Sequence, residues 1–153
     1  MKQQVFHVDT NLLNARQKIE EMNELEKMHD KEQITLVWSE TSQNEALNNS
    51  SEFLKKKANT HIYTINDEDE YTQTAIELDI FKIMEIENNS SSNDINDAKI
   101  VCEAHKYGAI LITNDGASKS QAKGILGRKE ELRKYVQVVT PIEALEIARK
   151  CTK

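Results

Sequence analysis

Two acidic residues, Asp9 and Asp115, lie at the ends of short apolar runs. Asp9 comes directly after VFHV, and Asp115 comes after ILIT and one asparagine. Such runs are typical of buried strands, and the carboxyl ends of parallel strands meet at one edge of a sheet. Two carboxylates brought together there repel one another unless a positive charge lies between them. These residues therefore point to a divalent cation held by carboxylate oxygens, with Mg²⁺ or Mn²⁺ favoured over zinc.

Asp97 is a third candidate ligand because of its place in a predicted helix. It lies three and four residues before Ile100 and Val101, which belong to the apolar stripe expected to pack on the sheet. A carboxylate on that stripe needs a partner. Considered alone, Asp97 is better explained as an acid near the free N–H groups of a helix start, a role for which Asn93 and Asp94 compete.

Glu45 is the fourth candidate, and two interpretations of it stay open. It follows Ser42 by three residues and precedes Ala46 and Leu47, as in the capping box that begins many helices. A glutamate in a capping box can use its carboxylate on the helix N-terminus instead of a metal. In that case Glu40 is the nearest substitute ligand.

Each acid taken singly also has a purely structural interpretation. Asp9 can be a turn residue at a strand end, and Asp115 lies in an Asn-Asp-Gly sequence that is common in turns. Together the four acids carry more weight, because all of them fall at predicted strand ends or helix starts. Those are the places that converge at one edge of a parallel sheet.

Alternating strands and helices determine the predicted fold. Apolar runs predict strands at 4–8, 34–38, 61–65, 109–113 and 136–139. Helical spacing, caps and acidic first turns predict helices near 12–22, 42–54, 67–87, 94–106 and 141–150, with a loop at 88–93. Gly108 is expected to cap the fourth helix and Pro141 to open the last one. The pattern predicts a single α/β domain over residues 1–153, a three-layer α/β/α fold with a mainly parallel central sheet.

Composition narrows the class of protein. The 153 residues, 38% of them hydrophobic, are enough for one core without disulfides. No apolar stretch approaches the roughly 18 residues of a membrane span, and the N-terminal apolar run is too short for a signal peptide, so we expect a cytoplasmic protein with no membrane partner. Cys102 and Cys151 lack zinc-ligand spacing and are expected to be plain thiols. No glycine-rich phosphate loop is present, which argues against a nucleotide cofactor.

The net charge of -6 argues against nucleic-acid binding by bulk electrostatics. The charge is uneven, however, because the segment from Gly116 to Lys134 holds six basic residues and two acidic ones. This basic segment, which includes Lys119 and Lys123, can pair with the backbone of single-stranded RNA. It can equally be a solvated helix face, and the two interpretations carry equal weight.

Across nearly its whole length the chain resembles the PIN-domain nucleases. The resemblance lies in VFHVDTNLLNA around Asp9, WSETSQNEALNN around Glu45, NDAKIVCEA around Asp97, and ILITND ending in Asp115. The terminal VVTPIEAL resembles the closing strand and helix of that family. No single motif is distinctive, and the order and spacing of the motifs carry the resemblance.

The resemblance implies a three-layer fold whose acidic site binds Mg²⁺ or Mn²⁺ and cleaves RNA phosphodiester bonds. The acidic positions of the family match Asp9, Glu45, Asp97 and Asp115, and its common polar neighbours match Asn11 and Asn114. The long basic stretch after Asp115 departs from the family pattern.

The chemistry that suits these residues is hydrolysis by a metal-activated water, with no nucleophile from the protein. Asp9, Asp97 and Asp115 would hold the metal. Glu45 would complete the metal's coordination shell or orient the water. Residues expected to fix the carboxylates or to meet the substrate are Thr10, Asn11, Thr113, Asn114, Lys119 and Lys123.

The predicted function is therefore that of a metal-dependent endoribonuclease, of a toxin or an RNA-processing type. Its expected partners are RNA, a small antitoxin-like protein and, in a homodimer, a second copy of the chain. The alternative is a catalytically inactive RNA- or protein-binding module on the same fold. A phosphoacceptor signalling domain is disfavoured, because Asn66 and Thr140 stand where that class needs an aspartate and a lysine.

Overall fold

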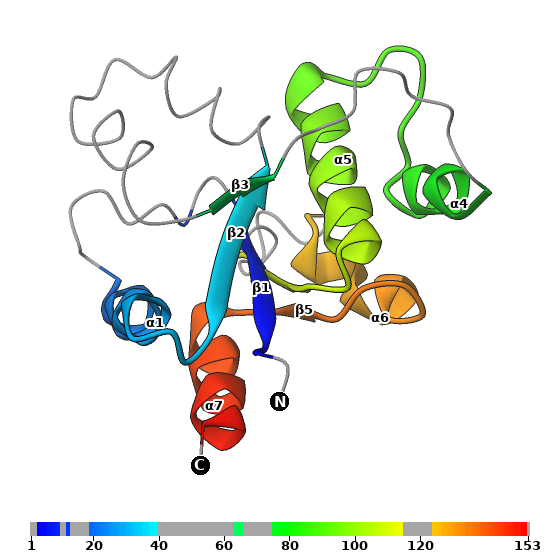
Figure 1. Ribbon diagram of the computed structural model, residues 1–153. Coiled ribbons are helices and arrows are strands. Elements are labelled where there is room, and N and C mark those ends of the chain that lie inside the picture. The colour runs from blue at the N-terminus through cyan, green and yellow to red at the C-terminus, as the bar shows by residue number, and fades with distance from the viewer. Residues whose placement is uncertain are drawn as a thin grey trace.

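The computed structural model describes residues 3–9, 12, 19–39, 63–65, 75–114 and 124–152. Within these residues one sheet is formed by β1 (Val5–Val8), β2 (Thr35–Ser39), β3 (Tyr63–Ile65), β4 (Ile110–Ile112) and β5 (Val138–Val139) (Figure 1). The helices are α1 (Glu20–Asp30), α4 (Ala75–Ile83), α5 (Ser92–Lys106), α6 (Lys129–Leu132) and α7 (Pro141–Cys151), and a 3₁₀ turn, η3, spans Leu126–Arg128. Each strand overlaps a strand predicted from the sequence.

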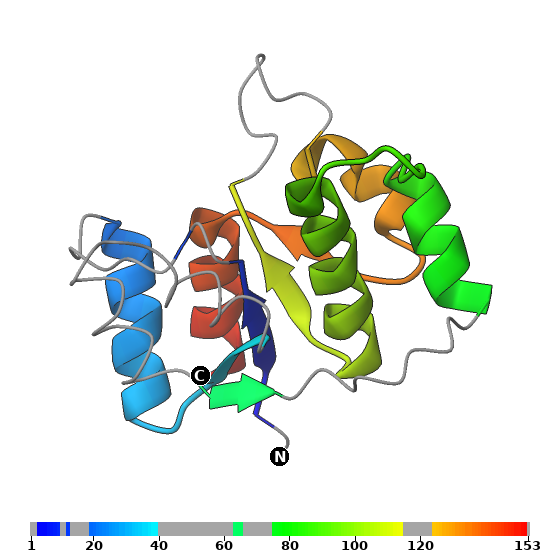
Figure 2. The ribbon, with the colours of Figure 1, turned by 90° about the horizontal axis from the view of Figure 1, so that it is seen from above.

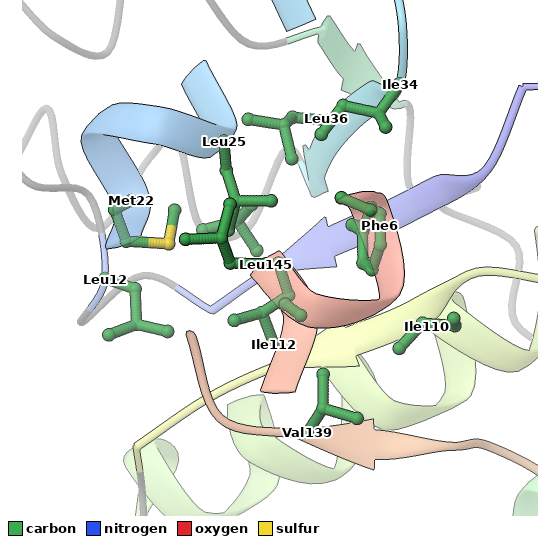
Figure 3. Packing of buried hydrophobic residues seen from close by; sticks show 13 residues of the cluster. Phe6, Leu12, Met22, Leu25, Ile34, Leu36, Ile110, Ile112, Val139 and Leu145 are labelled. Carbon is green, nitrogen blue, oxygen red and sulfur yellow. The ribbon is translucent and has the colours of Figure 1, made fainter. Parts of the chain in front are cut away.

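Helices cover both faces of the sheet (Figures 1 and 2). Helices α1 and α7 lie together on one face, where Phe6 and Val8 of β1 join their core (Figure 3). Helices α4, α5 and α6 cover the other face, where Leu111 of β4 and Val101 of α5 belong to a second core. All four strand pairs are parallel. The predicted three-layer α/β/α fold is confirmed, and its apolar strands are the kind that a sheet buried on both faces requires.

The order of the strands is β3-β2-β1-β4-β5. The chain moves outward from β1 through β2 to β3, then crosses over to β4 on the other side of β1 and continues to β5. The direction of winding thus reverses between β1 and β4. In open parallel sheets ligands bind beyond the carboxyl ends of the strands at such a reversal, because the connections leave the sheet on opposite faces there.

Helix α5 is held at both ends by local features of its sequence. Ser91 is the N-cap, and its hydroxyl accepts a hydrogen bond of 3.2 Å from the backbone N–H of Asp94. At the other end Gly108 adopts a left-handed conformation with φ of 63°, and the N–H of Ala109 donates to the carbonyl of Ala104 at 2.9 Å. The chain therefore reverses within the three residues 107–109, and α5 runs antiparallel to β4.

The first predicted helix is shifted along the chain. It was expected near 12–22, but α1 begins at Glu20 and ends at Asp30, because its buried positions continue past Met22 to Leu25 and His29. Ile19, inside the predicted range, is extended.

Two other predicted helix boundaries also differ from the structure. Helix α5 begins at Ser92 instead of Asp94, because the cap is earlier in the serine-rich loop than expected. Helix α4 ends at Ile83 instead of Glu87, and Glu85 takes a left-handed conformation with φ of 58°. The start of the predicted helix at 67–87 and the whole predicted helix at 42–54 fall outside the described residues.

Helix α7 follows its predicted start. Pro141 occupies its first turn, and Thr140 and Glu143 form a reciprocal capping box, with hydrogen bonds of 3.3 and 3.2 Å to each other's backbone N–H. Such a box satisfies two N–H groups that the helix itself leaves free. In the part of the chain that the structure describes, no helix has the length and apolar character needed to cross a membrane.

Candidate functional site

Asp9 and Thr113 lie side by side where the winding of the sheet reverses. Val8 and Ile112 are paired in the parallel register of β1 and β4, so the next residue of each strand extends past the same edge. The backbone N–H of Asp9 donates to the carbonyl of Ile112 at 3.0 Å, and the Thr113 hydroxyl donates to Oδ2 of Asp9 at 2.7 Å. Asp9 is 2% exposed and Thr113 is fully buried. The two residues form a buried, hydrogen-bonded polar pair at the carboxyl edge of the sheet.

The side chain of Asp9 lies on the α5 side of the sheet. Side chains alternate along a strand, and Phe6 and Val8 belong to the core under α1 and α7. His7 and Asp9 therefore point to the opposite face. The contact between Nε2 of His7 and Oε2 of Glu103, a residue of α5, is 3.4 Å long and agrees with this placement.

Asp97 lies on the buried face of α5. It shares a helical stripe with Val101 and Ala104, which are both fully buried, and it is itself partly buried. Asp97 is the sixth residue of a helix that begins at Ser92, which is beyond the free N–H groups of the first turn. The capping interpretation of Asp97 is therefore wrong.

The axial position of α5 brings Asp97 to the level of the Asp9–Thr113 pair. Ala104 and Ala109 are joined by a hydrogen bond where α5 turns back into β4. From Ala104 back to Asp97 the helix rises by about 10 Å, and from Ala109 to Thr113 the strand rises by about 13 Å. Asp97 thus lies near the carboxyl edge of β4, on the side of the sheet that Asp9 faces.

The other predicted site residues are either exposed or outside the described residues. Asn114 follows Thr113 and is exposed. The predicted positions that fall outside the described residues are Thr10, Asn11, Glu40, Glu45, Asp115, Lys119 and Lys123. Among the residues that are described, no three His, Cys, Asp or Glu side chains gather as a metal site, and of the four predicted acids that statement covers Asp9 and Asp97 alone.

Three members of the basic segment form ion pairs within the chain. Arg128, whose side chain is 14% exposed, pairs with Glu85 at 2.7 Å. Lys134 pairs with Asp79 at 3.2 Å. Arg133 and Glu130 are 3.9 Å apart on the surface. Arg128 and Lys134 thus pair with residues of other elements, which supports the structural interpretation for these two, whereas the exposed Arg133–Glu130 contact favours neither interpretation.

A network around Asp79 was not visible in the sequence. The Tyr135 hydroxyl donates a short hydrogen bond to Oδ2 of Asp79, the oxygen that Lys134 also approaches. The hydrogen bond from Tyr135, and then that from Lys134, lowers the pKa of the Asp79 carboxyl below its usual range. The same carboxylate raises the pKa of Tyr135 and that of Lys134. This network ties α4 to the turn that leads into β5, on the α5 face of the sheet.

The histidines include two structural residues. His7 is fully buried beside Glu103. His105 is partly buried, and its Nδ1 lies 3.0 Å from the carbonyl oxygen of Tyr135. One feature of the sequence indicates that His7 is buried with a polar partner. It lies within the apolar run VFHV, where a polar side chain needs a hydrogen-bonding partner.

Trp38 is 1% exposed and belongs to the core. The expectation that the two cysteines are plain thiols is confirmed. Cys102, which is buried, and Cys151, which is exposed, are both free thiols.

A comparison with models of known protein families finds no match, and a comparison with curated proteins finds no similar sequence. The resemblance to PIN-domain nucleases therefore rests on the sequence motifs.

Proposed function

We propose that the chain is a metal-dependent endoribonuclease of the PIN-domain type, whose acidic site lies at the carboxyl edge of the sheet between β1 and β4. The observation that carries the proposal is the buried Asp9 carboxylate, hydrogen-bonded to Thr113 where ligands bind in this class of sheet. Asp97 supports it, because a carboxylate on a buried helical stripe, past the reach of the helix start, needs a role other than capping.

The donor set fits Mg²⁺ or Mn²⁺. Asp9 and Asp97 offer carboxylate oxygens, which these cations prefer to the nitrogen and sulfur ligands that select zinc. A carboxylate as deeply buried as that of Asp9 is costly in its charged form unless hydrogen bonds or a cation compensate it. A bound cation would add to the stabilisation that the Thr113 hydroxyl provides. Asp115 and Glu45 complete the proposed set, as the sequence motifs indicate.

The residues of the chain have distinct roles in the proposed reaction. When bound, the cation polarises the scissile phosphate and lowers the pKa of a water molecule, which supplies the nucleophile. Thr113 fixes the orientation of the Asp9 carboxylate through one of its oxygens. Asn114 is exposed at the same edge and is suited to hydrogen-bond a phosphate oxygen. No side chain needs to form a covalent intermediate.

The charge distribution bears on how RNA would be held. With a net charge of -6, the chain has no general attraction for a polyanion, so the metal supplies the positive charge that meets the backbone. Lys119 and Lys123 remain the proposed RNA contacts, because Arg128 and Lys134 are engaged in ion pairs with other elements of the fold. An antitoxin-like partner, a homodimer and a cytoplasmic location stay predictions from the sequence.

Cleavage of single-stranded RNA in Mg²⁺ or Mn²⁺ tests the proposal. We expect Asp9→Asn and Asp97→Asn to lose about a hundredfold in rate, because each removes an oxygen that would hold the cation on which the nucleophile and the phosphate depend. Asp94→Asn makes the same change on an exposed residue of α5 and should cleave like the parent. Undiminished cleavage by both site variants, or activity that survives EDTA, would refute the proposal. RNA binding without cleavage would instead identify the inactive binding module.

A further inference from the structure

The contact between His7 and Glu103 crosses an interface that is otherwise largely apolar. His7 lies in the middle of β1 and is fully buried, and Glu103 lies on α5 with a side chain that is 13% exposed. Their Nε2 and Oε2 atoms are 3.4 Å apart. We propose that His7 and Glu103 are positioning residues, which set the axial register of α5 against β1 and thereby bring Asp97 to the level of Asp9. This inference rests on the proposed function, because it assigns the purpose of that register to metal binding.

The axial register of α5 against β1 determines how far apart Asp9 and Asp97 lie along the axis. Both strands of the site run parallel, and α5 runs antiparallel to them. From His7 to Asp9 the strand rises by about 7 Å toward the carboxyl edge. From Glu103 back to Asp97 the helix covers about 9 Å in the same direction. The His7–Glu103 contact therefore places Asp9 and Asp97 within about one helical turn of each other along the axis.

The covalent chain does not fix this register by itself. Helix α5 turns directly into β4 through Gly108, so its level relative to Thr113 is set by that short connection. Strand β1 is linked to α5 only indirectly, through its backbone pairing with β4, and the His7–Glu103 contact is a direct polar contact between the two elements. Apolar packing is non-directional and tolerates a shift of a helix along its axis, whereas a buried polar contact is lost when its partners separate. A polar pair in an apolar layer is therefore suited to specify one register.

Two polar residues of α5 face opposite flanks of the helix. An α-helix turns by about 100° per residue, so Glu103 and His105, which are two residues apart, lie on different sides of the helix axis. Glu103 meets β1, whereas His105 meets the carbonyl oxygen of Tyr135 on the other flank. The two residues are close in sequence and similar in burial class, and only Glu103 contacts the strand that carries Asp9. His105→Leu is thus a matched control for Glu103→Leu.

Calorimetric titration with Mn²⁺ tests the inference, together with the melting temperature of each variant. We expect Glu103→Leu to raise the dissociation constant for Mn²⁺ about tenfold, because removing residues that orient metal ligands weakens metal binding by about this much. Glu103→Gln keeps the reach and a hydrogen-bonding group, and should restore the constant to within about twofold. His105→Leu is expected to lower the melting temperature and to leave Mn²⁺ binding within about twofold of the parent.

The double variant His7→Leu/Glu103→Leu separates positioning from stability. It removes both members of the His7–Glu103 contact, so neither side chain is buried without the other, and its melting temperature should recover toward that of the parent. We expect its Mn²⁺ binding to stay about tenfold weaker. We also expect its crystal structure to show α5 displaced along its axis relative to β1. Parent-like Mn²⁺ binding by the double variant, or superimposable positions of α5 and β1, would overturn the inference. If the parent binds no Mn²⁺, the proposed function fails, and the two crystal structures still decide the positioning claim.

Discussion

The hydroxyl of Thr113 donates a 2.7 Å hydrogen bond to Oδ2 of Asp9, and both residues are buried at the ends of adjacent parallel strands. The two positions are 104 residues apart in the chain. The bond joins β1 to β4 at the point where the winding of the sheet reverses, which is where α/β folds of this kind bind ligands. It therefore gives a physical basis for the acidic site that the sequence motifs suggested.

Thr113→Val tests the value of this hydrogen bond. Valine has the shape of threonine without the hydroxyl, so the substitution leaves a buried carboxylate oxygen without its donor. We expect the free energy of unfolding in urea to fall by about 1 to 3 kcal/mol. Thr113→Ser keeps the hydroxyl and should retain more of the stability. A loss in Thr113→Ser together with parent-like stability in Thr113→Val would show that the methyl group, and not the hydrogen bond, matters at this position.

Gly108→Ala tests the connection between α5 and β4. The left-handed φ of 63° at Gly108 strains any residue with a Cβ, although no atom lies within 4 Å of the position that a Cβ would take. We expect a loss of about 1 to 2 kcal/mol in the free energy of unfolding. Gly127→Ala is the matched control, because Gly127 lies in the 3₁₀ turn η3 and is exposed. A loss at Gly127 as large as that at Gly108 would contradict the account.

The Asp79 network predicts a pH-dependent contribution to stability. The folded pKa of Asp79 is lowered, so its contribution is present above the usual value of 3.8 and is lost as the pH falls through the folded pKa. The pKa values of Tyr135 and Lys134 are raised, so their contributions are lost as the pH rises through their folded pKa values, above 10.0 and 10.5.

Asp79→Asn should therefore unfold at a lower urea concentration than the parent at pH 7. The difference between the two midpoints should shrink below about pH 3.8 and again in the alkaline range where the two partners titrate. Glu130→Gln, which removes a fully surface-exposed ion pair, is the control and should show a small difference at every pH. A midpoint difference for Asp79→Asn that does not change with pH would contradict the network.

Mn²⁺ should stabilise the folded protein by mass action. A ligand that binds only the folded state adds about 2.7 kcal/mol to the free energy of unfolding at a concentration one hundred times its dissociation constant. We therefore expect the melting temperature to rise with Mn²⁺ and to return to its original value when EDTA is added. The rise should be smaller in Asp97→Asn than in the parent, and unchanged in Asp94→Asn. An equal rise in all three proteins would indicate binding outside the proposed site.

The sequence predicted the strands well because β1, β2 and β4 are apolar runs, as a sheet covered on both faces requires. It also predicted the neighbourhood of Asp9 and Thr113, because strand ends of a parallel sheet share one edge. The end of α4 was missed for a physical reason. Met84 and Ile86 continue the apolar pattern, and Glu85 is not a residue type that signals a left-handed conformation.

The cap of α5 and the polar contacts between distant residues could not be predicted. The loop NNSSSND offers several good N-cap residues in succession, and propensity alone does not choose Ser91 among them. The pairs His7–Glu103 and Tyr135–Asp79 are separated by 96 and 56 residues. Their meeting depends on how the helices pack against the sheet, which local patterns do not encode.

The most direct test of the central claim is a calorimetric titration of Mn²⁺ into the parent, Asp9→Asn, Asp97→Asn and Asp94→Asn. The claim is that Asp9 and Asp97 belong to one metal site at the carboxyl edge of β1 and β4. It predicts saturable binding by the parent and by Asp94→Asn, and binding weakened at least about tenfold in each of the other two variants. Binding of equal strength in all four proteins, or no saturable binding by the parent, would contradict it.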